Sequence, residues 1–168
     1  MKSLENIRLV AFDFDDTLFA HRAHYPDTPS DHIQYIVTCL RSSKGLIPRS
    51  SLWGSCSTNS AFEEFMEYCE THDIVMGLIS WTAASVCATE KVTFVKERYH
   101  YTIENWCVGS IDEKVQMLKV LAEVYRLENE QILIIDDSVH VLTSANAEGF
   151  QAATPIEFVN YWNNFKKE

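Results

Sequence analysis

Two acidic groups follow short apolar segments that are typical of buried strands. The segment VAFDFDDTLF contains Asp13, Asp15 and Asp16, and the segment ILIIDDS contains Asp136 and Asp137. Carboxylates that lie close together raise one another's pKa, so they need a cation if they are to remain ionised together. Oxygen ligands without an accompanying set of His or Cys residues suit Mg²⁺. The two segments therefore indicate a magnesium site built from carboxylates.

A hydroxyl and an ammonium group complete the set of side chains that phosphoryl transfer requires. Ser80 ends the apolar run GLIS, and Lys114 lies in the segment SIDEKVQML, just before the second acidic group. Both side chains can bind phosphoryl oxygens, while a carboxylate can act as the nucleophile. Either acidic group alone is more often structural, because aspartates are common in turns and at helix N-termini. Their joint occurrence after apolar runs favours a catalytic site.

An EF-hand calcium loop is a competing interpretation of the first acidic group. Asp13, Asp15 and Thr17 occupy alternate positions, as ligands of such a loop do. The loop also needs a glycine where Leu18 stands and a terminal glutamate where His24 stands. The sequence therefore argues against an EF-hand.

The elements that would position these side chains alternate along the chain. Strands are expected at residues 9–12, 74–79, 106–108, 132–135 and, at a sheet edge, 150–153. Helical spacing of apolar residues covers 62–69, 92–99 and 115–125, and a last helix is expected after Thr154 and Pro155. Residues 41–60, rich in serine, are expected to form a long loop. The alternation predicts an α/β fold with a central, mostly parallel sheet, in which ligands bind beyond the carboxyl ends of the strands.

Composition narrows the class of protein. With 168 residues, 46% of them hydrophobic, the chain is expected to form a single domain. A net charge of −10 argues against nucleic acid as a partner. Five cysteines without CxxC spacing are typical of reduced thiols, and no segment has the roughly 20 apolar residues of a membrane span. We expect a soluble cytoplasmic protein.

The ordered set of motifs resembles the haloacid dehalogenase (HAD) superfamily of phosphohydrolases. That family has a strand ending in DxDxT, a strand ending in Ser or Thr, a lysine, and a strand ending in an acidic pair. The corresponding residues of this chain, in the same order, are Asp13 to Thr17, Ser80, Lys114 and Asp136 with Asp137. The resemblance extends from about residue 9 to residue 149.

The resemblance implies a Rossmann-like HAD core, a three-layer sandwich of helices around the sheet. Residues 1–168 would form one HAD-like hydrolase domain, with a flap and loop insert at about 20–60. That insert is too short for a separate cap domain, so the chain is similar to the capless magnesium-dependent phosphatases of the family. Four basic residues in or beside the insert could meet a second anionic group of a substrate, or could be ordinary surface charge: Arg22, Arg41, Lys44 and Arg49.

The resemblance also implies a role for each motif residue. Asp13 would attack phosphorus and form an aspartyl-phosphate, and Asp15 would act as general acid and base. Mg²⁺ would be held by Asp13, the Asp15 carbonyl, Asp136 and Asp137, with Asp137 as the direct ligand of the pair and Asp136 acting through water. The phosphoryl group would be bound by Ser80, Lys114 and the main chain at Phe14 and Asp15, with Trp81 lining the pocket. The substrate would be a phosphate monoester, either a small molecule or an exposed phosphoryl group on a macromolecule.

Four alternatives remain beside this interpretation. Lys91 could replace Lys114 as the phosphate-binding lysine, although its place in a helical pattern suggests a solvent-facing side chain. A response-regulator receiver uses similar groups, but there the acidic pair comes first and the lysine last. A catalytically inactive HAD-fold binding module would keep the metal site without turnover. A phosphotransferase or mutase would share the aspartyl-phosphate intermediate.

Overall fold

The computed structural model describes residues 3–19, 29–53 and 59–167, in which strands alternate with helices. The strands are β1 (Leu9–Phe12), β2 (Val75–Leu78), β3 (Glu104–Asn105), β4 (Ile132–Ile135) and β5 (Gln151–Ala153). The helices are α1 (Pro29–Ser43), α2 (Ser50–Trp53), α3 (Ser60–Thr71), α4 (Ser85–Tyr99), α5 (Glu113–Tyr125), α6 (Val139–Ala147) and α7 (Pro155–Phe165), with a 3₁₀ turn at Asn129–Gln131. None of the described helices combines the length and the apolar composition needed to cross a membrane.

The described strands form one parallel sheet with the order β3-β2-β1-β4-β5. The last residue of β1, Phe12, lies opposite Leu78 of β2 and Ile135 of β4. These three strands therefore end level with one another, and the residues that follow them meet at one edge. The predicted parallel α/β sheet is confirmed, as are the expected bounds of β1 and β4.

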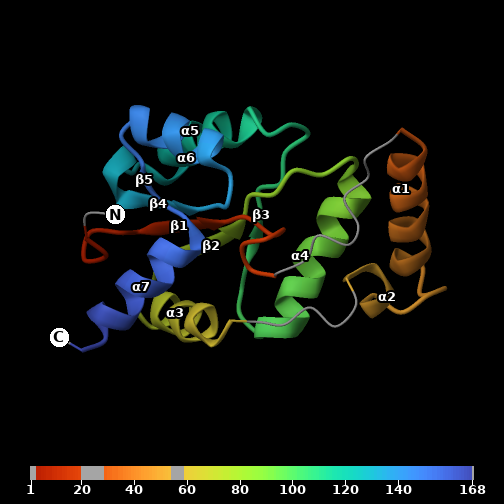
Figure 1. Ribbon diagram of the computed structural model, residues 1–168, viewed down its shortest axis with the longest axis horizontal. Helices are drawn as coiled ribbons and strands as arrows, with labels where there is room; N and C mark the ends of the chain where they lie inside the picture. Colours follow the sequence, from red (N-terminus) through yellow and green to blue (C-terminus); the bar gives the residue numbers. More distant parts are fainter. Residues whose placement is uncertain (1–2, 20–28, 54–58, 168) are drawn as a thin grey trace.

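Helices cover both faces of the sheet, as Figure 1 shows, with α5 and α6 on one face and α3 and α7 on the other. The side chains of β1 alternate between the two layers. Val10 and Phe12 pack in the cluster that includes α3 and α7, whereas Leu9 and Ala11 pack against α5 and α6. Helix α4 lies beside the carboxyl edge of the sheet, and α1 lies beyond it (Figure 1). The result is the expected three-layer sandwich.

The strand expected at 106–108 begins earlier, because β3 consists of Glu104–Asn105. The Trp106 amide still donates to the Leu78 carbonyl at 2.9 Å, so the chain continues along β2. The next amide, that of Cys107, donates instead to the side chain of Asn105. The Val108 amide in turn donates to the Ser80 carbonyl at 3.0 Å, and Val108 bridges Trp81, so residues 106–108 still run beside the chain that follows β2.

The insert before α3 contains two helices, so the loop expected at 41–60 is only partly correct. Helix α1 continues to Ser43 and α2 covers Ser50–Trp53, while residues 20–28 and 54–58, and Arg22 among them, lie outside the described ranges. Glu90 of α4, 2% exposed, accepts hydrogen bonds from Ser42 at 2.6 Å and from Arg49 at 3.0 Å. Arg49 also pairs with Glu97. In this structure Arg49 thus joins the insert to α4.

Gly77 of β2 allows the sheet to approach the ring of Trp106 closely. A Cβ atom at this position would overlap the indole ring, and both residues are buried. We expect Gly77→Ala to destabilise the fold by about 1 to 3 kcal/mol, because overpacking a core forces its neighbours to shift. Thermal unfolding should show a decrease of about 2 to 4 °C for each kcal/mol. Gly109→Ala is the matched control, since its Cβ would meet Glu113 at an ordinary 3.5 Å, and equal melting of the two variants would contradict the expectation.

Candidate active site

The turn after β1 is held in place from both sides. The Asp13 amide donates to the Ile135 carbonyl of β4 at 2.9 Å, so Asp13 continues the sheet for one more residue. Asp16 then adopts a left-handed conformation with φ of 53°, which aspartate tolerates better than most residues. The Tyr99 hydroxyl donates to the Leu18 carbonyl at 3.1 Å and ties the end of the turn to α4. The first acidic group therefore lies on a fixed turn.

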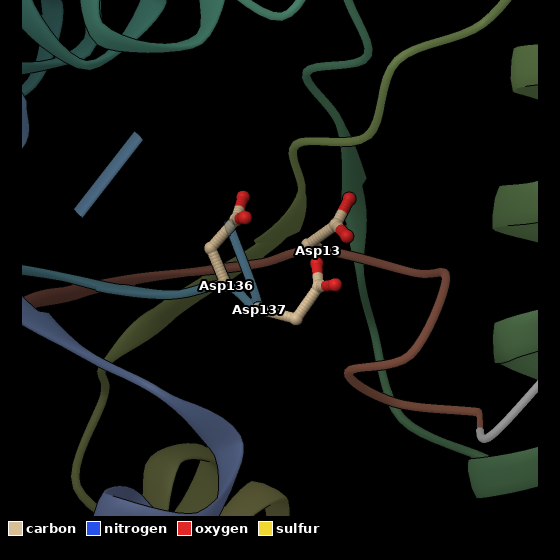
Figure 2. A group of neighbouring side chains, drawn as sticks. All are labelled: Asp13, Asp136 and Asp137. Atoms are coloured by element: carbon tan, nitrogen blue, oxygen red, sulfur yellow. The ribbon is translucent and has the colours of Figure 1, made fainter. Parts of the chain in front are cut away.

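Three carboxylates meet at the carboxyl ends of β1 and β4 (Figure 2). Oxygen atoms of Asp13, Asp136 and Asp137 lie within 4.8 Å of one another. Asp13 and Asp136 are buried, whereas Asp137 is exposed. The level ends of the two neighbouring strands bring these residues together, although more than 120 residues separate them in the chain.

Lys114, near the start of α5, lies between the two buried carboxylates. Its Nζ donates to Asp13 Oδ1 at 2.8 Å and to Asp136 Oδ2 at 2.7 Å, and the side chain is buried. Burial lowers the pKa of the Lys114 ammonium, but the two carboxylates more than offset this and leave its pKa above the ordinary value. Lys114 is therefore charged and holds Asp13 and Asp136 side by side.

The electrostatic balance of the cluster fits a divalent cation. Burial and the charge of Asp13 raise the pKa of Asp136 to about 6, although Lys114 acts against them. Burial, Asp13 and Asp16 also raise the pKa of Asp137. With its three carboxylates ionised and Lys114 as the one ammonium beside them, the cluster carries two unbalanced negative charges. One divalent cation would neutralise them. The oxygen donors suit Mg²⁺.

Asp136 and Asp137 differ in how their oxygens are used. Asp136 accepts the Ser138 amide on Oδ1 at 2.8 Å and Lys114 on Oδ2, so both of its oxygens already have protein partners. Asp137 is exposed beside the cluster. This difference favours Asp137 as the residue of the pair that would coordinate a metal ion directly.

Ser80 and Asp15 are joined by Lys91, whose helical pattern in the sequence suggested a solvent-facing side chain. That expectation is wrong, because Lys91 is only 3% exposed. Its Nζ donates to Asp15 Oδ2 at 2.6 Å and to Ser80 Oγ at 2.9 Å. Burial raises the pKa of the Asp15 carboxyl, and Lys91 offsets this only in part. Both lysines that the sequence offered as alternatives therefore lie in the site.

A signal for the burial of Lys91 exists in the sequence. Cys87, Lys91, Val95 and Tyr99 are spaced by four residues, and all four are buried on α4. Residues at this spacing share one helix face, so an apolar stripe that includes a lysine indicates a buried ammonium with a partner. The functional partner, Asp15, lies 76 residues away, and no local pattern identifies it.

The remaining predicted residues lie around this centre. The Phe14 ring packs against Phe19 and Trp53, with ring centres at 4.9 and 5.3 Å, so Phe14 can contribute only its main chain. The indole of Trp81 donates to the Gly109 carbonyl at 2.8 Å and follows Ser80 directly. Thr17 is buried, and its hydroxyl has no hydrogen-bond partner within the described ranges.

Comparison with known proteins finds similarity in structure only. No protein-family model and no curated sequence matches the chain. Solved structures with a similar fold include a hypothetical protein of Xanthomonas campestris (16% identity, TM-score 0.54), the cobalt-bound deoxy-D-mannose-octulosonate 8-phosphate phosphatase of Haemophilus influenzae (16%, 0.55) and the 3-deoxy-D-manno-octulosonate 8-phosphate phosphatase of Yersinia pestis (16%, 0.53). Each alignment covers 90% of this chain and, respectively, 65%, 70% and 64% of the other chain. The chain therefore shares the fold of these three proteins and spans about two thirds of their length.

Removal of the exposed carboxylate tests the metal site without disturbing the core. We expect Asp137→Asn to weaken Mg²⁺ binding at least about tenfold, because the cluster loses charge and a candidate ligand. Isothermal titration calorimetry with MgCl₂ measures this. Asp112→Asn is the matched control, because Asp112 is exposed and pairs with His140 instead. Equal Mg²⁺ affinity in the two variants would argue against a role for Asp137.

Removal of the buried cation tests the balance of charge. Lys114→Met leaves Asp13 and Asp136 facing each other without their shared partner, so we expect a loss of about 3 to 5 kcal/mol in EDTA. Mg²⁺ should restore part of that stability, because it supplies positive charge at the same carboxylates. Chemical denaturation with EDTA and with Mg²⁺ provides the comparison. Lys119→Met, at a surface lysine that pairs with Glu148, should change the free energy of unfolding neither in EDTA nor in Mg²⁺. If Mg²⁺ raises the free energy of unfolding of Lys114→Met no more than that of wild type, this expectation is contradicted.

Proposed function

We propose that this chain is an Mg²⁺-dependent phosphohydrolase that cleaves a phosphate monoester through an aspartyl-phosphate intermediate. The observation that carries the proposal is the meeting of Asp13, Asp136 and Asp137 around Lys114 at the carboxyl edge of the sheet. The fold, shared with HAD phosphatases, supports the same activity. Two of the similar structures are phosphatases of an octulosonate 8-phosphate, which agrees with a phosphate monoester as the class of substrate.

Asp13 is the proposed nucleophile. Lys114 donates to Asp13 Oδ1, so we assign the attack on phosphorus to Oδ2. As the bond from Oδ2 to phosphorus forms, the bond from phosphorus to the leaving oxygen breaks. The hydrogen bond from Lys114 and the sheet hydrogen bond of the Asp13 amide orient the carboxylate before substrate arrives.

Asp15 is the proposed general acid and base. Its proton passes to the leaving oxygen in the first step, and in the second step Asp15 takes a proton from the water that attacks phosphorus. The bond from phosphorus to Asp13 then breaks and inorganic phosphate is released. The raised pKa of Asp15 favours the protonated form that the first step needs.

Ser80 and Lys114 are the proposed side-chain ligands of the phosphoryl group. Lys114 uses two of its three N–H groups on Asp13 and Asp136, so the third can donate to a phosphoryl oxygen. The Ser80 hydroxyl and the main-chain amides of Phe14 and Asp15 would donate to the other oxygens, where negative charge develops. Trp81 would border the bound group from its position next to Ser80.

Asp13, Asp137, the Asp15 carbonyl and, through water, Asp136 would hold Mg²⁺. When bound, the ion offsets the negative charge that the nucleophile and the phosphate bring together. The protein contributes the arrangement of the oxygens and the second cation, Lys114.

Asp13→Asn tests the proposed function directly. Wild type should release inorganic phosphate from p-nitrophenyl phosphate in the presence of Mg²⁺ and not in EDTA, and Asp13→Asn should lower the rate at least about 10³-fold, because the nucleophile is lost. Phosphate release and p-nitrophenol are measured in parallel. Asp112→Asn is the control with unchanged turnover expected.

A panel of sugar phosphates, nucleotides and phosphopeptides extends the same assay. If wild type is as inactive as Asp13→Asn on every substrate, the hydrolase proposal fails. If p-nitrophenol exceeds free phosphate when an alcohol is added, the alcohol accepts the phosphoryl group and the chain is a phosphotransferase instead.

A further inference from the structure

Lys91 has all three of its ammonium hydrogens directed at the ends of two strands. Its Nζ donates to Asp15 Oδ2 at 2.6 Å, to Ser80 Oγ at 2.9 Å and to the Trp81 carbonyl at 3.1 Å. An ammonium group has three donors, so these bonds use all of them. Lys91 therefore has no N–H left for a phosphoryl oxygen in this arrangement, unlike Lys114.

The side chain of Lys91 is buried, and its ammonium lies beside an aromatic ring. Its side chain is 4% exposed, and its ammonium lies 5.0 Å from the centre of the buried Phe14 ring. Burying an ammonium costs free energy, and an apolar residue of similar length would fill the same space without that cost. Packing of α4 alone therefore does not require a lysine here.

The bonds of Lys91 fix two groups that the proposed reaction uses. With Oδ2 of Asp15 bound to Lys91, the carboxyl group cannot rotate freely, and Oδ1 is the oxygen left to exchange a proton with substrate and water. The Ser80 oxygen accepts from Lys91 at 2.9 Å, and its own hydrogen makes a long bond of 3.5 Å to the Trp81 carbonyl, which a phosphoryl oxygen would replace. One side chain from α4 thus sets the orientation of an acid and of a hydroxyl that come from β1 and β2.

We propose that Lys91 is a positioning residue that acts through Asp15, holding its carboxyl group so that Oδ1 faces the leaving oxygen. The proposal rests on the proposed function. In the first step the proton on Asp15 Oδ1 moves to the leaving oxygen as the bond from phosphorus to that oxygen breaks and the bond to Asp13 forms. In the second step a water proton returns to Oδ1, the water oxygen bonds to phosphorus, and the bond to Asp13 breaks. Lys91 takes no part in either proton transfer.

Substrates that differ in the basicity of the leaving group test this role. Phenyl phosphate releases a basic oxygen that needs a proton, whereas p-nitrophenyl phosphate releases an oxygen that needs it much less. We expect Lys91→Met to lower kcat/KM about 10²-fold for phenyl phosphate and at most about tenfold for p-nitrophenyl phosphate, since a positioned general acid contributes about 10² to 10⁴ in rate. Lys96→Met, at an exposed lysine of the same helix, should match wild type on both substrates.

The Asp15→Asn background shows whether Lys91 acts through Asp15. In the Asp15→Asn background, adding Lys91→Met should lower kcat/KM by the same factor for both substrates. The reason is that the effects of substitutions at two residues that act as one unit do not add. The proposal is overturned if Lys91→Met lowers kcat/KM by the same factor for both substrates. It is also overturned if Lys91→Met lowers kcat/KM for phenyl phosphate by the same factor with Asp15 present and with Asp15→Asn.

Folding and the activity itself need separate measurements. Lys91→Arg and Lys91→Met are first compared with wild type by thermal unfolding, and kinetics are taken well below each melting temperature. Arginine keeps a donor to Asp15, so it should recover more of the phenyl phosphate activity than methionine does. If Lys91→Met does not fold, Lys91→Arg is compared with wild type on the same two substrates. We then expect Lys91→Arg to lose less kcat/KM for p-nitrophenyl phosphate than for phenyl phosphate. An inactive wild type contradicts the proposed function, whereas an active wild type with an unaffected Lys91→Met contradicts only the role of Lys91.

Discussion

The arrangement of the site depends on like charges that are held together at the end of a buried sheet. Asp13 and Asp136 are both nearly or fully buried, and without a cation their repulsion and their loss of hydration would oppose folding. Lys114 supplies that cation from the first turn of α5, with hydrogen bonds of 2.8 and 2.7 Å. Because β1 and β4 pair in register and end level, the main chain holds the two residues that carry these carboxylates side by side. The sheet therefore holds the carboxylates close together although their charges repel. Lys114 together with a divalent ion would offset this repulsion.

A second cation forms a separate network beside the first. Lys114 binds the carboxylates of β1 and β4, whereas Lys91 binds Asp15 and Ser80, at the ends of β1 and β2. The neighbouring residue on α4, Glu90, instead accepts hydrogen bonds from Ser42 and Arg49 of the insert. Helix α4 thus links the insert to the turn that carries the proposed acid.

The fold alone accounts for where chemistry can occur and not for what is bound. In a parallel sheet all strands present their carboxyl ends to one side, so residues after different strands meet there whatever the protein does. The acidic cluster, Ser80 and the two lysines turn this general position into a site suited to phosphoryl transfer. Under the proposed function, selection among phosphate monoesters would come from residues around this edge, and α1, α2 and the turn after β2 are the described candidates (Figure 1).

Local patterns in the sequence determined those helices and strands whose buried residues recur at short, regular intervals along the chain. Apolar runs specified β1 and β4 to the residue, and the proline after Thr154 marked the start of α7, where Thr154 caps the helix. The spacing of the acidic motifs was enough to predict that Asp13 and Asp137 approach each other, because parallel strands share one edge. Helix α1 was not predicted, since it is stabilised against α4 by contacts such as Ser42 with Glu90. The partners of Lys91 were decided only by tertiary structure, because the same helical position is solvated or buried depending on what packs over it, and Asp15 reaches it from 76 residues away.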